Sequence, residues 1–252
     1  MIDLTPFMGI GLLLVRPGTL IMTAPGFGGT YAPAQVKIGL TLLLAFVLMP
    51  TVTPPSIGSA TGLAVVVTRE MAIGLALGMS IRALVAAAEL AGQLAGFQMG
   101  LSYAAIVDPQ SGVRNNLLSA LYSNIAIITF LLMNGHHAFL RALRDSYDSL
   151  PMGIGHIGSS LPAAVMALLG LVFSFGTRLA APLVLVLVIT EIALALVARS
   201  APSLNLMAVG APVRIIIGLV LLGFVAPAAV GVLAGISGTV LQAGVRAAEA
   251  FR

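Results

Sequence analysis

Long stretches of this sequence contain no Asp, Glu, Lys or Arg and are rich in Leu, Val, Ile and Ala. A helix needs about 20 mainly apolar residues to cross the hydrocarbon core of a bilayer. Four uncharged stretches exceed that length, at residues 38–68, 115–140, 149–177 and 215–245. The pattern therefore predicts helices that cross a membrane or lie within one.

Clusters of Pro and Gly that favour turns separate the apolar stretches, at residues 24–29, 54–58, 108–112 and 151–155. The longest apolar segments exceed what one crossing needs, so they must kink, divide or extend beyond the membrane. We therefore predict one all-α membrane domain over residues 1–252 with about six hydrophobic helices. The expected helices lie near 4–24, 36–53, 62–100, 116–142, 161–199 and 206–248.

One polar connector, at residues 141–151, interrupts this pattern. Arg141 precedes Asp145 by four residues, and Arg144 precedes Asp148 by the same spacing. Such i,i+4 pairs of opposite charge lie on one face of a helix. We interpret this connector as a short, solvated helix end.

The composition excludes several classes of function. Of the 252 residues, 59% are hydrophobic and only 8% are charged, against about a quarter charged in a soluble domain. The 12 basic residues are scattered singly along apolar sequence and form no stripe, which argues against nucleic-acid binding. With no cysteine and only three histidines, the chain offers little to a metal or a cofactor. No catalytic motif is present, so we expect a protein that is not an enzyme.

Several charged residues lie inside or at the edge of the apolar helices. A charge at a helix centre costs roughly 2.5–3.5 kcal/mol on insertion scales, so it normally faces protein or water instead of lipid. Pairing with other helices or other chains is the favoured interpretation, and an ion relay is the alternative. The residues concerned are Arg16, Arg69, Glu70, Arg82, Glu89, Arg178 and Glu191.

Small residues recur every fourth position on the third expected helix. The ridge consists of Ala88, Gly92, Gly96 and Gly100. A ridge of this kind lets the backbone of another helix approach closely. The pattern is common in membrane proteins and by itself predicts only close packing.

The run at residues 91–112, AGQLAGFQMGLSYAAIVDPQSG, resembles the central signature of the R-type flagellar biosynthetic membrane proteins, a family shared with the T component of injectisomes. Residues 16–37, 134–151 and 199–214 resemble other parts of that family in the expected order. The GFQMGLSYA form is similar to the flagellar branch. Ser203 stands where the family pattern has Gln.

The resemblance implies a subunit of the flagellar protein export gate in the bacterial inner membrane, within the basal body. Family members assemble with P-type and Q-type subunits, contact lipid and a B-type export-switch membrane protein, and pass unfolded export substrates. The fold implied is a P-like helical part at 1–150 fused to a Q-like helical hairpin at 160–252, with the join near 151–162.

The resemblance also implies roles for two loops. The loop at 101–116 would project into the pore and plug it, and its residues are Leu101, Tyr103, Ile106, Val107, Asp108, Pro109 and Gly112. An ordinary interhelical turn is the alternative. The loop between the last two helices would include Arg199, Pro202, Asn205, Gly210, Pro212 and Arg214.

Two other functions stay open. An ion-coupled secondary transporter could use Glu70, Glu89 or Glu191, although no inverted repeat is visible. An intramembrane hydrolase or transferase would need a nucleophile and a base, and the sequence offers none that can be named.

Overall fold

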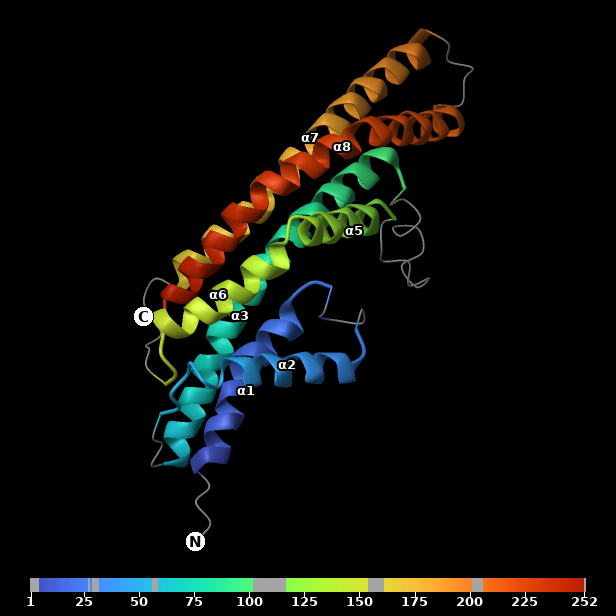
Figure 1. Cartoon of the computed structure of the whole chain (residues 1–252). Helices are drawn as coiled ribbons and strands as arrows, with labels where there is room; N and C mark the ends of the chain where they lie inside the picture. The colour runs from blue at the N-terminus through green and yellow to red at the C-terminus, as the bar shows by residue number, and fades with distance from the viewer. Residues whose placement is uncertain are drawn as a thin grey trace. The chain divides into compact units, whose positions relative to one another are not determined.

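The computed structural model describes residues 5–26, 28, 32–55, 59–101, 117–153, 161–200 and 206–251. Seven α-helices and no strand occur in these residues (Figure 1). The all-α fold predicted from the apolar pattern is therefore confirmed. The helices are α1 (Thr5–Thr23), α2 (Ala34–Leu48), α3 (Ala60–Met99), α5 (Leu117–Leu132), α6 (Gly135–Ser149), α7 (Leu161–Ser200) and α8 (Leu206–Glu249).

Helices α3, α7 and α8 are each long and apolar enough to cross a membrane. Their 40 to 44 residues correspond to about 60 Å at 1.5 Å per residue, twice the thickness of a bilayer core. In α3, 67% of the most apolar window is buried within the chain, against 17% in α7 and 11% in α8. Helix α3 is thus packed by this chain, whereas α7 and α8 present apolar surface to lipid or to other proteins.

The helix expected near 116–142 is divided into α5 and α6, and the two helices are bent by 70° at the break. The backbone of Asn134 adopts a left-handed conformation, with φ 56° and ψ 28°. Asn tolerates this conformation better than other non-glycine residues. The expectation of one continuous helix was wrong here, because an Asn-Gly pair stops the helical hydrogen-bond ladder.

Helix α6 is more than a solvated helix end. It buries Phe139, Leu143 and Tyr147, which are spaced four residues apart and therefore share one face. The charged side chains Arg141, Arg144, Asp145 and Asp148 are exposed. Helix α6 is thus amphipathic, with one face packed against the protein.

The chain forms two compact units. Unit 1 comprises residues 1–83, 131–170 and 237–252, and unit 2 comprises residues 84–130 and 171–236. Because α3, α7 and α8 each contribute to both units, this division does not follow the expected join near 151–162. The division into a P-like part and a Q-like hairpin stays a prediction.

In unit 1, α1 packs against α2 and against the first half of α3 (Figure 1). Gly74 and Gly78 of α3 face Thr19 and Thr23 of α1, and a Cβ at either glycine would collide with the threonine hydroxyl. Each hydroxyl donates a hydrogen bond to a carbonyl of its own helix, over 3.0 Å from Thr19 to Val15 and 2.9 Å from Thr23 to Thr19. The close approach therefore leaves no threonine hydroxyl unsatisfied.

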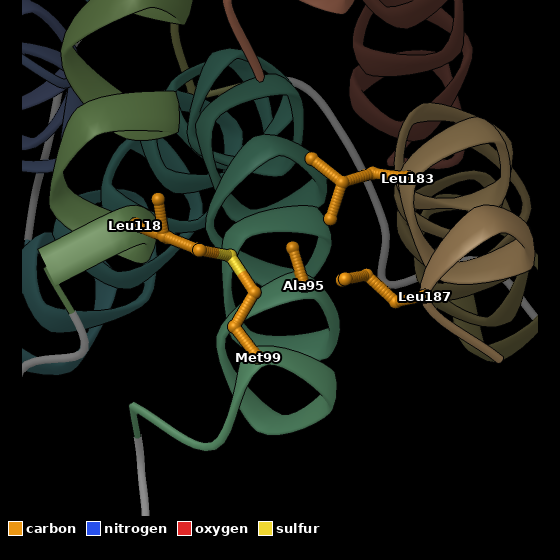
Figure 2. Packing of buried hydrophobic residues seen from close by; sticks show 5 residues of the cluster. All are labelled: Ala95, Met99, Leu118, Leu183 and Leu187. Carbon is orange, nitrogen blue, oxygen red and sulfur yellow. The ribbon is translucent and has the colours of Figure 1, made fainter. Parts of the chain in front are cut away.

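In unit 2, Figure 2 shows a hydrophobic cluster where α3, α5 and α7 meet. Met99 of α3 points toward Leu118 of α5, while Leu183 and Leu187 of α7 point toward Ala95 of α3. All five side chains are at most 1% exposed. This cluster holds the last turns of α3 in place.

Candidate functional site

A buried ion pair connects α1 and α3 in unit 1. Arg16 Nε donates to Glu70 Oε2 over 2.8 Å, and Arg16 Nη2 donates to Glu70 Oε1 over 3.1 Å. The two residues are 0% and 1% exposed. This is the two-pronged guanidinium–carboxylate geometry, which combines the charge attraction with two aligned hydrogen bonds.

The remaining contacts of Arg16 reach α6 and the residue that follows it. Nη1 donates to Ser146 Oγ over 3.0 Å, and Nη2 donates to the Leu150 carbonyl over 3.0 Å. The guanidinium carbon also lies 4.0 Å from the centre of the Tyr147 ring. Burying a charged group is costly unless its hydrogen-bond donors find acceptors. The Arg16 guanidinium finds them on α3, on α6 and at Leu150, so this one side chain connects α1, α3 and α6.

The adjacent residues Arg69 and Glu70 both contact Gly153, which lies four residues after the end of α6. The Gly153 amide donates to Glu70 Oε1 over 3.5 Å, and Arg69 Nη1 donates to the Gly153 carbonyl over 3.4 Å. Gly153 has φ 77°, and a Cβ there would lie 2.9 Å from the Pro55 ring. The partners seen for Arg16, Arg69 and Glu70 thus belong to this same chain.

In unit 2, the C-terminal end of α3 directly precedes the segment expected to plug a pore. Gly100 has φ 80°, its amide bonds to Phe97 O over 3.0 Å, and the Leu101 amide bonds to Gly96 O over 3.0 Å. These two bonds form a Schellman motif, which satisfies the last carbonyls of the helix. Leu101 packs against the cluster of Figure 2. The helix therefore has a defined end at the start of that segment.

Within the last turn of α3, a polar bridge links α3 to α7 and α8. Gln98 Nε2 donates to Glu191 Oε2 over 3.0 Å, and Glu191 Oε1 lies 3.5 Å from Arg214 Nη1. Arg214 Nε also donates to the Gly210 carbonyl over 3.3 Å. The side chain of Glu191 is 56% exposed and that of Arg214 is 28% exposed. At that exposure the bridge contributes little to the free energy of folding, and its main effect is to orient the three side chains.

The residues of the small-residue ridge on α3 have different functions. At Gly92 a Cβ would lie 2.5 Å from the Leu118 carbonyl oxygen and from Ser119 Cα, so the α5 backbone makes the close approach. Ala88 and Gly96 are buried. Gly100 has no described heavy atom within 4 Å of a Cβ position, so its role is to end the helix.

The other charges expected to need partners lie in different surroundings. Glu89 Oε1 accepts a hydrogen bond from Ser123 Oγ over 3.3 Å, and the Glu89 carbonyl accepts one from Ser119 Oγ over 3.0 Å. Arg82 and Arg178 are exposed on their helices, with the Arg178 guanidinium 5.8 Å from the Phe175 ring. Glu70, Glu89 and Glu191 therefore each have polar partners of their own.

The loop expected between the last two helices is shorter than predicted. Arg199 lies in the last turn of α7, and Gly210, Pro212 and Arg214 lie inside α8. Pro212 is the seventh residue of α8 and lies past its first turn, where a proline removes one backbone hydrogen bond and favours a kink. Assigning these four residues to the loop was therefore wrong.

Eight residues of the two predicted loops lie outside the described part of the chain, so their roles stay predictions. They are Tyr103, Ile106, Val107, Asp108, Pro109, Gly112, Pro202 and Asn205.

Sequence reasoning missed the polar partners of the predicted charges, namely Gln98, Ser123, Ser146 and Tyr147. Ser146 and Tyr147 lie 130 or more residues from Arg16 in the chain, and no local pattern reports such a contact. The only available signal was the spacing of Phe139, Leu143 and Tyr147, which predicts a buried face on α6.

Comparisons with known proteins give the family. Residues 7–239 match the family model described as "Bacterial export proteins, family 1". The flagellar biosynthetic protein FliR of Escherichia coli K12 is 32% identical over 215 residues, covering 85% of this chain and 82% of the relative. FliR of Bacillus subtilis 168 is 31% identical, covering 88% of this chain and 86% of the relative. FliR of Pectobacterium carotovorum is 34% identical, covering 84% of this chain and 82% of the relative. The chain therefore belongs to the family of bacterial export proteins, family 1, together with the R-type flagellar biosynthetic proteins.

Proposed function

We propose that this chain is a core subunit of the flagellar type III protein export gate and assembles with P-type and Q-type subunits around a channel for unfolded substrates. The observation that carries the proposal is the identity of 31–34% to proteins named flagellar biosynthetic protein FliR, over more than four fifths of both chains. The proposal places the protein in the inner membrane within the flagellar basal body, where a B-type export-switch protein is a further neighbour.

The surfaces of α7 and α8 support the assembly part of this proposal. Both helices are long and apolar, yet only 17% and 11% of their most apolar windows are buried within the chain. Large side chains such as Phe173, Leu185 and Phe224 are 62–78% exposed. Helices of neighbouring subunits or lipid would cover this surface, and a gate supplies both.

The defined end of α3 supports the plug part. A plug needs a fixed base, and the Schellman motif at Gly100 together with the cluster around Met99 and Leu118 provides one. We propose that residues 101–116, which follow this base, close the channel in the resting gate.

The geometry does not favour the ion-coupled transporter. A coupling carboxylate has to exchange its ion along a hydrated path. Glu70 is 1% exposed and is held by both prongs of Arg16. Glu89 accepts a hydrogen bond from Ser123, and Glu191 accepts one from Gln98 and pairs with Arg214 over 3.5 Å.

The export function is tested in the bacterium that encodes this chain. Deleting the gene should abolish both motility and secretion of flagellar filament protein, and the intact gene supplied in trans should restore both. Normal secretion in the deletion strain would contradict the proposal.

The plug is tested on the assembled gate in a planar bilayer. Deleting residues 108–112 should make the gate conduct small ions at rest, because the segment would no longer reach across the channel. The wild-type gate is the control. Equal conductance of the two gates, at equal subunit content, would contradict the plug while leaving the export function intact.

A further inference from the structure

A groove in unit 1 is lined by residues to which the proposed function assigns no role. It has a volume of about 530 Å³ and lies between α3, α6 and α8. Its apolar lining includes Leu77, Ala138, Leu241 and Val245. Volumes of 300–1,000 Å³ are typical of sites that bind small molecules. The groove is therefore large enough for a ligand.

Four charges line the rim of this groove, two of each sign. Arg141 and Asp145 belong to α6, and Arg246 and Glu249 belong to α8. All four residues are exposed, and among the described residues none of their side chains makes an ion pair or a hydrogen bond. Both guanidinium groups and both carboxylates are therefore available to a ligand that carries charges of both signs.

The position of the groove along α8 indicates the class of ligand. Residues 215–245 of α8 are uncharged, and Arg246 and Glu249 follow directly. This boundary between apolar and charged residues is where a membrane helix meets the lipid headgroups. The groove combines an apolar floor with a charged rim at that boundary, which is also the polarity of a phospholipid.

We propose that this groove binds a zwitterionic aminophospholipid. Its phosphate lies between Arg141 and Arg246, because guanidinium groups bind phosphate through two parallel hydrogen bonds. Its primary ammonium lies at Asp145 and Glu249. Its glycerol and the upper part of an acyl chain lie along Leu77, Leu241 and Val245.

The headgroups available for a test differ in ways that separate these contacts. Phosphatidylethanolamine has a phosphate and an ammonium that donates three hydrogen bonds. Phosphatidylcholine has the same charges but no N–H donor, and phosphatidylglycerol has the phosphate without a cation. The site should therefore prefer phosphatidylethanolamine to both of the others.

The first measurement uses the full-length chain in mild detergent, mixed with equal amounts of the three lipids and analysed by native mass spectrometry. We expect one retained phosphatidylethanolamine at collision energies that remove the other two lipids. Equal retention of the three lipids would overturn the proposal, because it would indicate only unspecific lipid around the protein.

The second measurement compares matched variants on α6. Arg141→Gln should lower phosphatidylethanolamine occupancy about fivefold, the effect of one basic residue at a membrane surface. Arg144→Gln, which removes the same charge one turn away and outside the groove lining, should leave the occupancy unchanged. Equal occupancy in the two variants would contradict the site.

A third pair of variants addresses the ammonium. Asp145→Asn should weaken phosphatidylethanolamine binding without affecting phosphatidylglycerol, whereas Asp148→Asn should affect neither. A photoreactive side chain at Gln242, which also lines the groove, should crosslink to lipid in cells. Crosslinks to protein alone would show that a protein segment occupies the groove and would overturn the proposal.

Discussion

At the scale of single residues, Arg16 and Glu70 contribute the most distinctive chemistry. Both side chains are removed from solvent, and together with Ser146 and the Leu150 carbonyl they satisfy each other's hydrogen bonds. Replacing a buried ion pair by apolar residues is often neutral, but removing one partner leaves an uncompensated buried charge. The pair therefore specifies how α1, α3 and α6 fit together more than it adds to the net free energy of folding.

This argument predicts a non-additive result. Arg16→Met and Glu70→Leu should each lower the free energy of unfolding by about 3–5 kcal/mol, and the double variant should lower it by less than the sum. The free energy is measured by titrating the full-length chain in mild detergent with a denaturing detergent. Arg144→Met, at an exposed position, is the control and should change little. Additive losses would show that the two side chains act independently.

Gly92 makes a second prediction at this scale. Gly92→Ala should lower the free energy of unfolding by about 1–3 kcal/mol, because its Cβ would collide with the α5 backbone, which cannot move as a side chain can. Gly231 lies in α8, and no described heavy atom lies within 4 Å of the position that its Cβ would take. Gly231→Ala should therefore raise the free energy of unfolding by about 0.5–1 kcal/mol. The same titration measures both variants. A loss of stability no larger at Gly92 than at Gly231 would contradict the close packing of α3 and α5.

At the scale of elements, the apolar pattern predicts which segments are helical and fails mainly at their ends. In a bilayer, backbone N–H and C=O groups must form hydrogen bonds within the protein, and a helix forms all of them within one segment. A long uncharged stretch therefore has few alternatives to a helix. The break between α5 and α6 at Asn134 was missed because Asn134 and Gly135 lie within an uncharged stretch, and the helix bounds were predicted from the positions of charged residues. Gly210, Pro212 and Arg214 were placed in a loop from the family resemblance, yet they lie within α8, as the apolar pattern over residues 206–248 predicts.

The bend between α5 and α6 can be tested at its one left-handed residue. Asn134→Val should lower the free energy of unfolding by about 1–2 kcal/mol, because a β-branched residue does not tolerate positive φ. Asn134→Gly should be tolerated. Asn124→Val is the matched control, since Asn124 is exposed within α5 and has helical dihedral angles. Equal effects of the two valine substitutions would contradict the left-handed bend.

At the scale of the whole molecule, the sequence predicts the class of protein and its family, while the partners of the charged residues come only from the structure. The all-α membrane fold follows from 59% hydrophobic and 8% charged residues. The contacts of Arg16 with Ser146 and Leu150 could not be predicted, because they join segments 130 or more residues apart. The apolar surfaces of α7 and α8 indicate that the fold is completed by lipid or other subunits.

The central claim, that this chain is one subunit of a larger gate, is tested most directly by its mass in the assembled state. The chain is co-expressed with the P-type and Q-type subunits of the same genome, extracted in mild detergent and analysed by native mass spectrometry. We predict one large species that contains the P-type and Q-type subunits and a single copy of this chain. A stable particle that contains only this chain would contradict the claim.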